Sequence, residues 1–549
     1  MRRFKTDLVL AVLSFMLLIS PAAADESVGP ILPPHETPDT PPAQLKIQHP
    51  DSPRETPAPA RIAQPSHPSL NRPELDLRPI PSLPPLAPAI GPTRTFQNPP
   101  SPEPVNPDEK LPPPEKNPAA PSSSELALRP YWKDGLFFES SDKRFKLNVG
   151  GRTQFDAAWM IAPKSVQFGP NGVGRVDDAV NFRRARLDVS GTLFGTVDFF
   201  SQYDFLNTFV VDRVSGIARP ANTPVPTDLW IAFTQLPRIG TIKIGNQKPP
   251  ISFEHLTSSR FLNFLERSMG FDAFIEDQDN GFRPGIQIFN TAFDDRMTMA
   301  IGYFKHTRNI FGWNTGDGEG DVTGRITMLP IYECDGRFLV HLGVGASHRD
   351  LDDHVARFRG RTMVRNGPAV LHTILADASM VGKNQQLVVP EMAIVWGPFS
   401  LQAEYFATWV NGAAIPAAAP PRVPQGTVFF HAYTVEAHYF LTGEHRAYNK
   451  KSGAFGRQPP NRNLRWGKER DEHGPGWGAW QVAIRYQFLD LEDKGINGSI
   501  VNEFTAGLNW FLNPNMKVQW NYSLADRNSA GAASDGIIHS FGTRLAWDF

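Results

Sequence analysis

Two arginines at period-two spacing are the first residues in this sequence that could do chemistry. The stretch NFRRARLDVSGTLFG, residues 181–195, places Arg184, Arg186 and Asp188 on one face of an extended strand and aliphatic side chains on the other. Guanidinium groups stay charged at any relevant pH and hold several anion oxygens through forked donors. Such a row can bind anions where it faces water, or serve as structural ion pairs where it faces carboxylates. Asp188 leaves the second alternative open.

Short segments of alternating hydrophobicity would position these arginines. From Tyr131 onward, stretches such as GRTQFDAAWM and MKVQWNYSL alternate polar and apolar side chains at period two, which predicts strands with one apolar face. Segments of about ten residues are long enough to cross a membrane as tilted strands. We predict sixteen strands, at residues 147–160, 178–193, 195–207, 227–236, 240–247, 282–290, 296–306, 320–328, 336–348, 386–396, 398–410, 427–442, 477–490, 501–512, 515–526 and 536–549.

The connections between these segments indicate a barrel in an outer membrane. Short turns, such as Gly397-Pro398, alternate with longer loops, and an even strand number returns the C-terminus to the side where the barrel began. The last strand, HSFGTRLAWDF, ends in Phe549 and resembles the assembly signal of outer-membrane barrel proteins generally. A soluble β-sandwich would also alternate, but the combination favours the membrane. We therefore predict an all-β fold, a 16-stranded antiparallel transmembrane β-barrel.

The N-terminal region is predicted to be a leader followed by a linker. A basic start, a short apolar core and the run Ala22-Ala23-Ala24 predict a signal peptide at residues 1–24. Residues 25–130 hold more than half of the 52 prolines and lack apolar periodicity, so we predict a disordered or extended Pro-rich linker. The barrel then occupies residues 131–549. This order places the barrel in the bacterial outer membrane and the linker in the periplasm.

The bulk composition argues against several classes of protein. The 55 basic and 56 acidic residues balance, which argues against a nucleic-acid partner. The single cysteine, Cys334, excludes an intrachain disulfide. The acidic run DGEGD lacks the remaining ligand spacing of a calcium loop, and the sequence holds no Ser/His/Asp motif, phosphate-cradling glycine loop or zinc-helix motif. We expect no catalytic residue, no metal and no cofactor.

Several segments together resemble the phosphate-selective porin O and P family. They are NFRRARLDVSGTLFGTVDFFSQYDF, IGNQKPPISFEHLTSSRFLNFLERS, GPFSLQAEYFATWV, AYTVEAHYFLTGEHRAY, GAWQVAIRYQFLDL and FTAGLNWFLNPNMKVQWNY, and they occur in the family's order from about Phe145 to Phe549. The resemblance implies a sixteen-stranded barrel that assembles as a homotrimer. It also implies an arginine-lined, anion-selective pore, constricted by an infolded third extracellular loop, with phosphate as the solute.

The loop that aligns with the family's constriction spans residues 248–281. Its basic residues are Lys248, Arg260 and Arg267. Its acidic residues are more numerous: Glu254, Glu266, Asp272, Glu276, Asp277 and Asp279. Such an excess of carboxylates would repel phosphate unless the acids point away from the narrowest point.

The strand residues predicted to face inward supply the other candidate anion ligands. Those assigned to the pore lining, beside the three loop cations, are Arg152, Arg184, Arg186, Lys243, Arg325 and Arg485. The same rows also carry acids, namely Asp156, Asp188, Asp198, Asp204, Asp228, Glu391, Glu404 and Glu436. Because the two signs balance, anion selectivity requires the basic groups to gather into a track. Otherwise the arginines pair with carboxylates and brace the wall.

Three further basic features fall outside this assignment. Arg183 has the outward parity, so we expect it to anchor at the membrane interface rather than in the pore. The loop 349–385 and the segment 443–476, which stands where a short periplasmic turn is expected, are both rich in arginine and lysine. The favoured interpretation is that both are solvated surface segments, and the alternative is that either folds inward as a basic gate.

Together these features predict a passive outer-membrane channel for small anions, with phosphate the implied solute. One alternative is a general, non-selective porin. Another is an envelope tether, in which the barrel anchors the linker 25–130 to cell wall or to a periplasmic partner. The remaining expected partners are outer-membrane lipid and two further copies of the chain.

Overall fold

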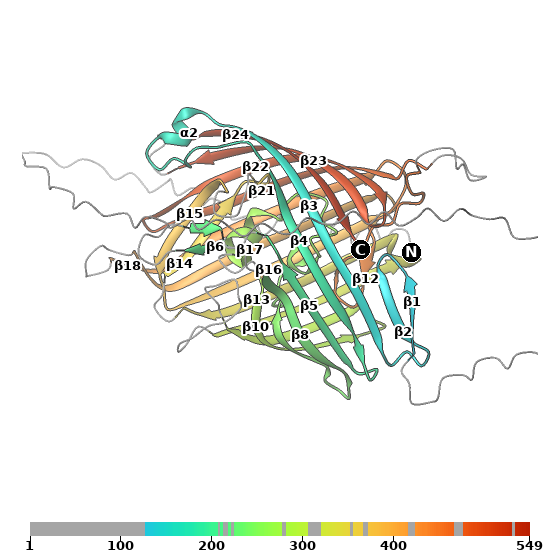
Figure 1. Ribbon diagram of the computed structural model, residues 1–549. Coiled ribbons are helices and arrows are strands. Elements are labelled where there is room, and N and C mark those ends of the chain that lie inside the picture. The colour runs from blue at the N-terminus through green and yellow to red at the C-terminus, as the bar shows by residue number, and fades with distance from the viewer. Residues whose placement is uncertain are drawn as a thin grey trace, which may run out of the picture. The chain divides into compact units, whose positions relative to one another are not determined.

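The chain forms a closed barrel of sixteen antiparallel strands in the computed structural model (Figure 1), and these strands confirm the sixteen predicted segments. The structure describes residues 127–206, 209–211, 218–220, 224–276, 281–305, 320–351, 355–365, 372–415, 423–465, 476–529 and 533–549. The barrel strands are β3 (Lys146–Ile161), β4 (Ala179–Leu193), β5 (Val197–Asp204), β8 (Val225–Leu236), β9 (Gly240–Gln247), β10 (Arg283–Ala292), β11 (Met297–Lys305), β12 (Gly320–Glu333), β13 (Phe338–Asp350), β16 (Asn384–Trp396), β17 (Phe399–Ile415), β18 (Val423–Phe440), β21 (Ala479–Asp493), β22 (Ile496–Asn513), β23 (Met516–Asn528) and β24 (Gly536–Asp548). Each pairs with the next, and β24 pairs with β3. The predicted signal peptide and most of the predicted linker lie outside the described residues.

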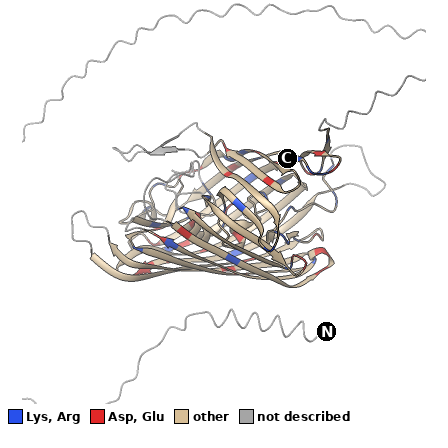
Figure 2. Cartoon of the chain, turned by 90° about the horizontal axis from the view of Figure 1, so that it is seen from below, with Lys and Arg blue, Asp and Glu red and all other residues tan. Residues whose placement is uncertain are grey.

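Apolar side chains of the strands face outward and polar side chains face inward, as predicted. On β4, Leu187 is 54% exposed and Val189 38% exposed on the outer face, whereas Arg186 and Asp188 are buried inside. Basic and acidic positions are interspersed along the wall (Figure 2). An outer face of this kind suits lipid, and an inner face of charged and amide groups suits a water-filled interior.

The C-terminal residue closes the barrel. The backbone N–H of Phe549 donates to the carbonyl of Gly151 at 3.1 Å, and the N–H of Gly151 donates to the carbonyl of Phe549 at 3.0 Å. A Cβ on Gly151 would stand 2.9 Å from the Phe549 ring, so only glycine permits this approach. The terminal aromatic that the sequence analysis singled out therefore lies at the seam between the first and last strands.

One connection is shorter than predicted. The gap between the thirteenth and fourteenth predicted segments, residues 491–500, was expected to be a loop, but β21 and β22 extend through most of it and join at Lys494-Gly495. Both residues have positive φ, 49° and 80°, which suits the tight primed turn of a two-residue hairpin.

The remaining elements are short and lie outside the set of sixteen barrel strands. They are the hairpin β1 (Leu128–Trp132) and β2 (Leu136–Ser140), the ribbon β6 (Phe209–Val211) and β7 (Ala218–Pro220), the pair β14 (Val355–Arg361) and β15 (Ile374–Val381), the pair β19 (Tyr448–Asn449) and β20 (Ala454–Phe455), and the helices α2 (Lys164–Phe168), α3 (Phe253–Leu256), α4 (Met269–Phe271), η1 (Asp272–Glu276) and η2 (Cys334–Gly336). Strand β2 extends the sheet by pairing with the start of β3. Among the described residues, the helices are all too short to cross a bilayer.

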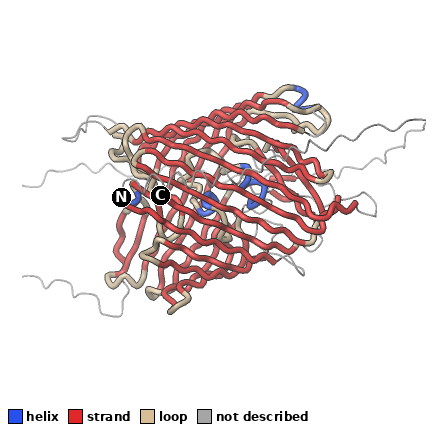
Figure 3. Tube along the Cα trace, turned by 180° about the vertical axis from the view of Figure 1, so that it is seen from behind, coloured by secondary structure: helices blue, strands red, loops and turns tan. Residues whose placement is uncertain are grey.

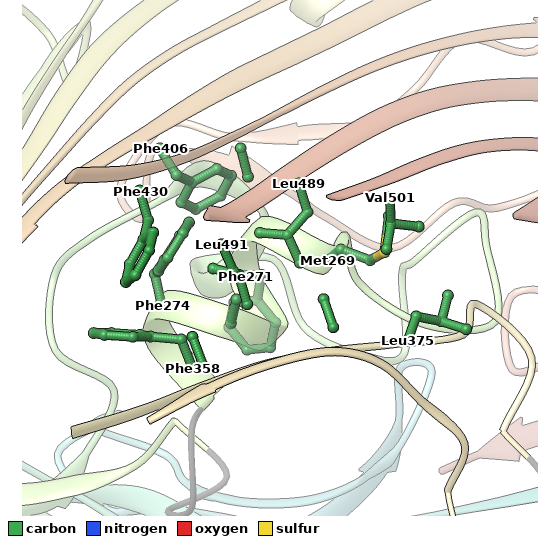
Figure 4. Packing of buried hydrophobic residues seen from close by; sticks show 14 of the residues in the cluster. Met269, Phe271, Phe274, Phe358, Leu375, Phe406, Phe430, Leu489, Leu491 and Val501 are labelled. Carbon is green, nitrogen blue, oxygen red and sulfur yellow. The ribbon is translucent and has the colours of Figure 1, made fainter. Parts of the chain in front are cut away.

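An apolar cluster fills part of the barrel interior. Helices α4 and η1 lie in the middle of the barrel (Figure 3) and contribute Met269, Phe271 and Phe274. These pack against Phe358 and Leu375 of the β14–β15 pair (Figure 4). The wall contributes inward residues of β17, β18, β21 and β22: Phe406, Val410, Val428, Phe430, Leu489 and Val501. All are buried, so this side of the interior is packed rather than open to water.

The outer face supports a prediction about lipid contact. A Leu187→Lys variant should lower the free energy of unfolding by about 2–4 kcal/mol, because a lysine near the middle of the lipid-facing wall must be desolvated. Val180→Lys, near the end of the same strand and 65% exposed, should cost only about 0–1 kcal/mol because it can reach the interface. Urea titrations of folding into lipid vesicles, followed by tryptophan fluorescence, measure both. Equal losses in the two variants would contradict a lipid-facing position for Leu187.

Candidate pore lining

The segment between β9 and β10 lies inside the barrel. Arg152 of β3 donates to the hydroxyl of Ser259 at 2.6 Å. From other sides of the wall, Arg485 of β21 donates to the carbonyl of Glu266 at 3.0 Å, and Asn521 of β23 accepts from the N–H of Leu265 at 2.8 Å. A segment that contacts strands around the barrel in this way must cross the interior. The family resemblance implied this placement of the loop.

A β-bulge directs two adjacent arginines into the barrel and corrects the assignment of Arg183. In the pairing of β3 with β4, Gln154 faces Arg184 but Phe155 faces Phe182, so Arg183 is an extra residue. Arg183 is consequently buried and donates to both carboxylate oxygens of Glu266, at 2.9 and 3.0 Å. The interface anchor predicted from strict alternation is therefore wrong. Period-two counting fails because a bulge shifts the parity by one residue.

The carboxylate of Glu266 is the hub of this arrangement. Besides Arg183, it accepts from Arg184 at 3.3 Å and from Arg544 at 2.9 Å. Arg544 also holds Asp156 at 2.6 Å. Burial by itself would raise the pKa of the Glu266 carboxyl, but the surrounding guanidinium groups outweigh it and hold that pKa well below its ordinary value. Glu266 is thus an ionised carboxylate that ties the crossing segment to β4 and β24.

The other acids of the crossing segment that the structure describes are also held by arginines. Glu254 accepts from Arg485 at 2.9 Å. Asp272 accepts from Arg365 at 3.2 Å and from Arg361 in a closer contact. Glu276 lies 3.6 Å from Arg361, whereas Asp277 and Asp279 lie outside the described residues. The acidic excess noted in the sequence is therefore compensated within the part of the segment that is described.

Five of the nine candidate anion ligands already have carboxylate partners. Arg184 contacts Glu266; Arg186 lies 2.7 Å from Asp204; Arg260 lies 2.6 Å from Asp188; Arg325 lies 2.5 Å from Glu391; and Arg485 contacts Glu254 and Glu436. The ion-pair alternative that Asp188 left open thus describes their geometry. Arg325 also donates to the carbonyl of Gly453 at 2.7 Å. Arg184, Arg260, Arg325 and Arg485 fasten the infolded segments to the wall, whereas Arg186 joins β4 to β5.

The other four candidates contact only neutral groups among the described residues. Arg152 donates to Ser259 and to Gln202, the latter at 2.8 Å. Lys248 donates to the carbonyl of His255 at 2.6 Å. Arg267 donates to the carbonyls of Glu254 and Thr257, at 2.9 and 2.6 Å, and Lys243 places its ammonium 5.0 Å from the centre of the Trp230 ring. Within the described part of the chain, no carboxylate contacts these four side chains.

The two other basic segments also enter the barrel, so their assignment as solvated surface segments is wrong for the residues that are described. In loop 349–385, Arg361 and Arg365 hold Asp272, and the β14–β15 pair joins the apolar cluster. In segment 443–476, Phe455 packs 4.9 Å from Phe253 and Arg446 lies 3.7 Å from the Phe455 ring. The apolar residues within these charged segments favour their burial. A count of the charged residues alone does not take the apolar residues into account.

A lumenal cavity of ≈ 800 Å³ remains between these segments and the wall formed by β5, β8, β9, β10, β11 and β12. Its lining includes Lys243, Lys248, Trp230 and Asp228, with Lys451 contributed by segment 443–476. Trp230 was not among the residues assigned from the sequence, and Lys451 belongs to the segment 443–476 whose inward folding was the alternative interpretation. The inward parity of Trp230 was readable from its position next to Asp228, whereas Lys451 enters only because its segment folds inward.

A closed sixteen-stranded barrel with a lipid-facing apolar surface and a charged interior is an outer-membrane porin, a channel of the bacterial outer membrane. The model of the phosphate-selective porin O and P family matches residues 148–549, and the chain belongs to that family.

Relatives and solved structures with similar sequences or folds include several porins. Porin O of Pseudomonas aeruginosa is 24% identical over 453 residues, which cover 76% of this chain and 91% of that protein. An uncharacterized protein of Caulobacter vibrioides is 26% identical over 449 residues, 79% of each chain. Among solved structures, the outer membrane channel DcaP of Acinetobacter baumannii matches with a TM-score of 0.41 and 13% identity, covering 75% of this chain and 99% of that one. Salmonella typhi OmpF in complex with daunomycin matches with a TM-score of 0.41 and 15% identity, covering 77% and 100%.

The Glu266 hub can be tested by removing its charge. Glu266→Gln removes the carboxylate charge that Arg183, Arg184 and Arg544 share, although Arg544 keeps its ion pair with Asp156. Breaking a buried pair in this way costs about 3–5 kcal/mol. We expect the crossing segment to detach and to be cut by trypsin after Arg260 or Arg267, which mass spectrometry identifies. Asp177→Asn is the matched control, because its ion pair with Arg175 is exposed and is worth about 1 kcal/mol or less. A Glu266→Gln barrel whose segment resists trypsin as the control does would refute the hub.

Proposed function

We propose that this porin is a passive diffusion channel selective for small anions of the phosphate type. The observation that carries the proposal is that acidic and basic groups inside the barrel differ in their partners. The described acids of the crossing segment are held by arginines, whereas Lys243 and Lys248 face the lumenal cavity without a carboxylate in contact among the described residues. An anion in the cavity therefore meets ammonium groups whose charge is available to it.

The solute path in this proposal runs along one side of the barrel. The apolar cluster occupies the side of β17, β18, β21 and β22, so water and ions are left with the side of β5 to β12, where the cavity lies. The crossing segment, residues 248–276, narrows the lumen and acts as the constriction. Arg152 and Arg267, which also contact only neutral groups, extend the set of cations toward the segment itself.

The nine basic residues assigned to the pore lining have two roles in this proposal. Arg184, Arg260, Arg325 and Arg485 hold the infolded segments in place, and Arg186 braces the wall between β4 and β5. The charges of all five are largely balanced by their carboxylate partners. Arg152, Lys243, Lys248 and Arg267 act on the passing anion. Anion selectivity then depends on the second set directly and on the first set through the shape of the lumen.

The cellular arrangement is part of the same proposal. We infer that residues 1–24 direct export, that the Pro-rich residues 25–130 extend into the periplasm as a tether toward cell wall or a periplasmic partner, and that the barrel assembles as a homotrimer. Chemical cross-linking of the purified protein tests the trimer. A cell-wall pulldown with the chain and with a variant lacking residues 25–130 tests the tether, since a spacer that binds nothing would give equal recovery.

A general porin is the competing function, and a specific observation favours it: the cavity also carries Asp198, Asp228 and Asp295. If these carboxylates cancel the lysines, chloride and potassium should permeate about equally. The reversal potential of a planar bilayer under a potassium chloride gradient separates the two functions. A potential near zero or of cation-selective sign would contradict the proposal.

The two lysines provide the mutational test. Lys243→Gln combined with Lys248→Gln should shift the reversal potential toward cation selectivity and raise the phosphate concentration that halves the chloride current by roughly 10-fold, as expected for losing contacts to charged groups worth about 1.5–3 kcal/mol.

The matched control is Lys133→Gln with Lys143→Gln, which removes two exposed lysines of the β1–β2 region and the same total charge. The control should conduct as the unmodified channel does. Identical phosphate block in the two double variants would show that Lys243 and Lys248 do not contact the permeating anion.

A further inference from the structure

The lumenal cavity is far larger than an inorganic phosphate requires. Its volume of ≈ 800 Å³ falls in the range of about 300–1,000 Å³ that suits ligands of drug-like size. It is bounded on the outside by β5 to β12 and on the inside by Leu256 of helix α3 and by Lys451 and Ser452 of segment 443–476. The infolded segments thus turn a stretch of open lumen into a compartment with walls on both sides.

The cavity is lined by charged groups of both signs that are not in direct contact with one another. Lys243 and Lys248 contact only a ring and a carbonyl. Asp198 accepts from the hydroxyl of Thr192 at 2.7 Å, and Asp228 accepts from the indole N–H of Trp230 at 3.1 Å. Within the described part of the chain, none of these four makes an ion pair, in contrast to the arginines that fasten the crossing segment.

Neutral polar groups add further hydrogen-bonding capacity to the same lining. They are Thr192, Thr234, Gln235, Thr241, Gln287, Asn290, Thr291 and Thr298. Carboxylates accept only, amides and hydroxyls both donate and accept, and ammonium groups donate only. This mixture matches a solute that carries several hydroxyl groups together with an anionic group, and it exceeds what a bare oxyanion can use.

An aromatic surface lines the wall of the cavity. Trp230 and Phe289 both face it, from β8 and β10. Trp230 is stacked on Phe200, with ring centres 5.9 Å apart, and the Lys243 ammonium lies 5.0 Å from the centre of the Trp230 ring. Phe289 has no ring partner of this kind among the described residues, so its ring is available to the apolar C–H face of a sugar ring or to another flat group.

We propose that this cavity binds small phosphorylated sugars, of about the size of a hexose phosphate, on their way through the channel. The inference rests on the proposed anion selectivity and extends it from the inorganic ion to an organic phosphate. The phosphate contacts the ammonium groups of Lys243 and Lys248. The hydroxyls bond to Asp198, Asp228 and the neutral polar lining, and the ring lies against Phe289.

Block of single-channel current by three solutes tests the proposal on the full-length protein in planar bilayers. Glucose 6-phosphate, inorganic phosphate and glucose are added separately to a potassium chloride electrolyte. Glucose 6-phosphate should halve the current at a lower concentration than inorganic phosphate, and glucose should not block. Uptake of labelled glucose 6-phosphate into proteoliposomes should show that the solute passes through.

Phe289→Ala gives the specific variant. It should weaken the block by glucose 6-phosphate by roughly 3- to 10-fold more than the block by phosphate, because an aromatic contact is lost only for the sugar. Phe504→Ala, which removes a phenylalanine from the lipid-facing surface, is the matched control and should leave both blocks unchanged. If Phe289→Ala does not fold, as judged by its heat-modifiable mobility on gels, Phe289→Leu keeps apolar bulk and removes the flat ring.

The outcomes separate this inference from the function on which it rests. A channel without anion selectivity and without phosphate block refutes both. A channel blocked by phosphate, but no more strongly by glucose 6-phosphate, refutes only the sugar phosphate site. An advantage for glucose 6-phosphate that survives both Phe289 substitutions also refutes it, because the cavity would then not be where the sugar binds.

Discussion

The carboxylate of Glu266, held by three arginines inside the barrel, is the interaction on which the rest of the interior depends. An ion in a partly desolvated interior is costly unless it is paired and hydrogen-bonded. Arg183, Arg184 and Arg544 meet that cost from two strands that are adjacent to the closing seam. Once Glu266 is placed, the remainder of the crossing segment is directed across the lumen, toward Arg485 on one side and the β14–β15 pair on the other.

Two kinds of packing then divide the interior. On the side of β17 to β22, helices α4 and η1 meet Phe406, Phe430 and Leu489, and the contact is apolar and closed. On the side of β5 to β12, the crossing segment stays apart from the wall and the cavity of ≈ 800 Å³ remains. A porin interior is usually regarded as uniformly polar. Here an apolar half supports the segment mechanically, and a polar half is left for solute.

This division also explains why a nearly neutral chain can hold an anion-selective path under the proposed function. The contacts that each charged side chain makes matter here, and the total numbers of acidic and basic residues do not. The described acids of the crossing segment form ion pairs with arginines such as Arg361 and Arg485. Lys243 is held by the Trp230 ring, which positions an ammonium group without neutralising it. In the proposed path, an aromatic ring holds Lys243, whereas arginines hold the described acids of the crossing segment.

The sequence by itself determined the barrel, because a strand in a membrane wall must alternate apolar and polar side chains. This alternation is visible within each short segment of the sequence. Leu187 and Val189 facing lipid, the sixteen strands and the terminal Phe549 all follow from nearest-neighbour patterns. Only the tertiary structure decided which way Arg183 points, since a single bulged residue reverses parity without any signal in composition. It alone also decided which arginines meet carboxylates and which segments enter the lumen. Those contacts join residues as far apart as Asp156 and Arg544, and a pairing at such separation depends on closure of the whole barrel, which no local pattern records.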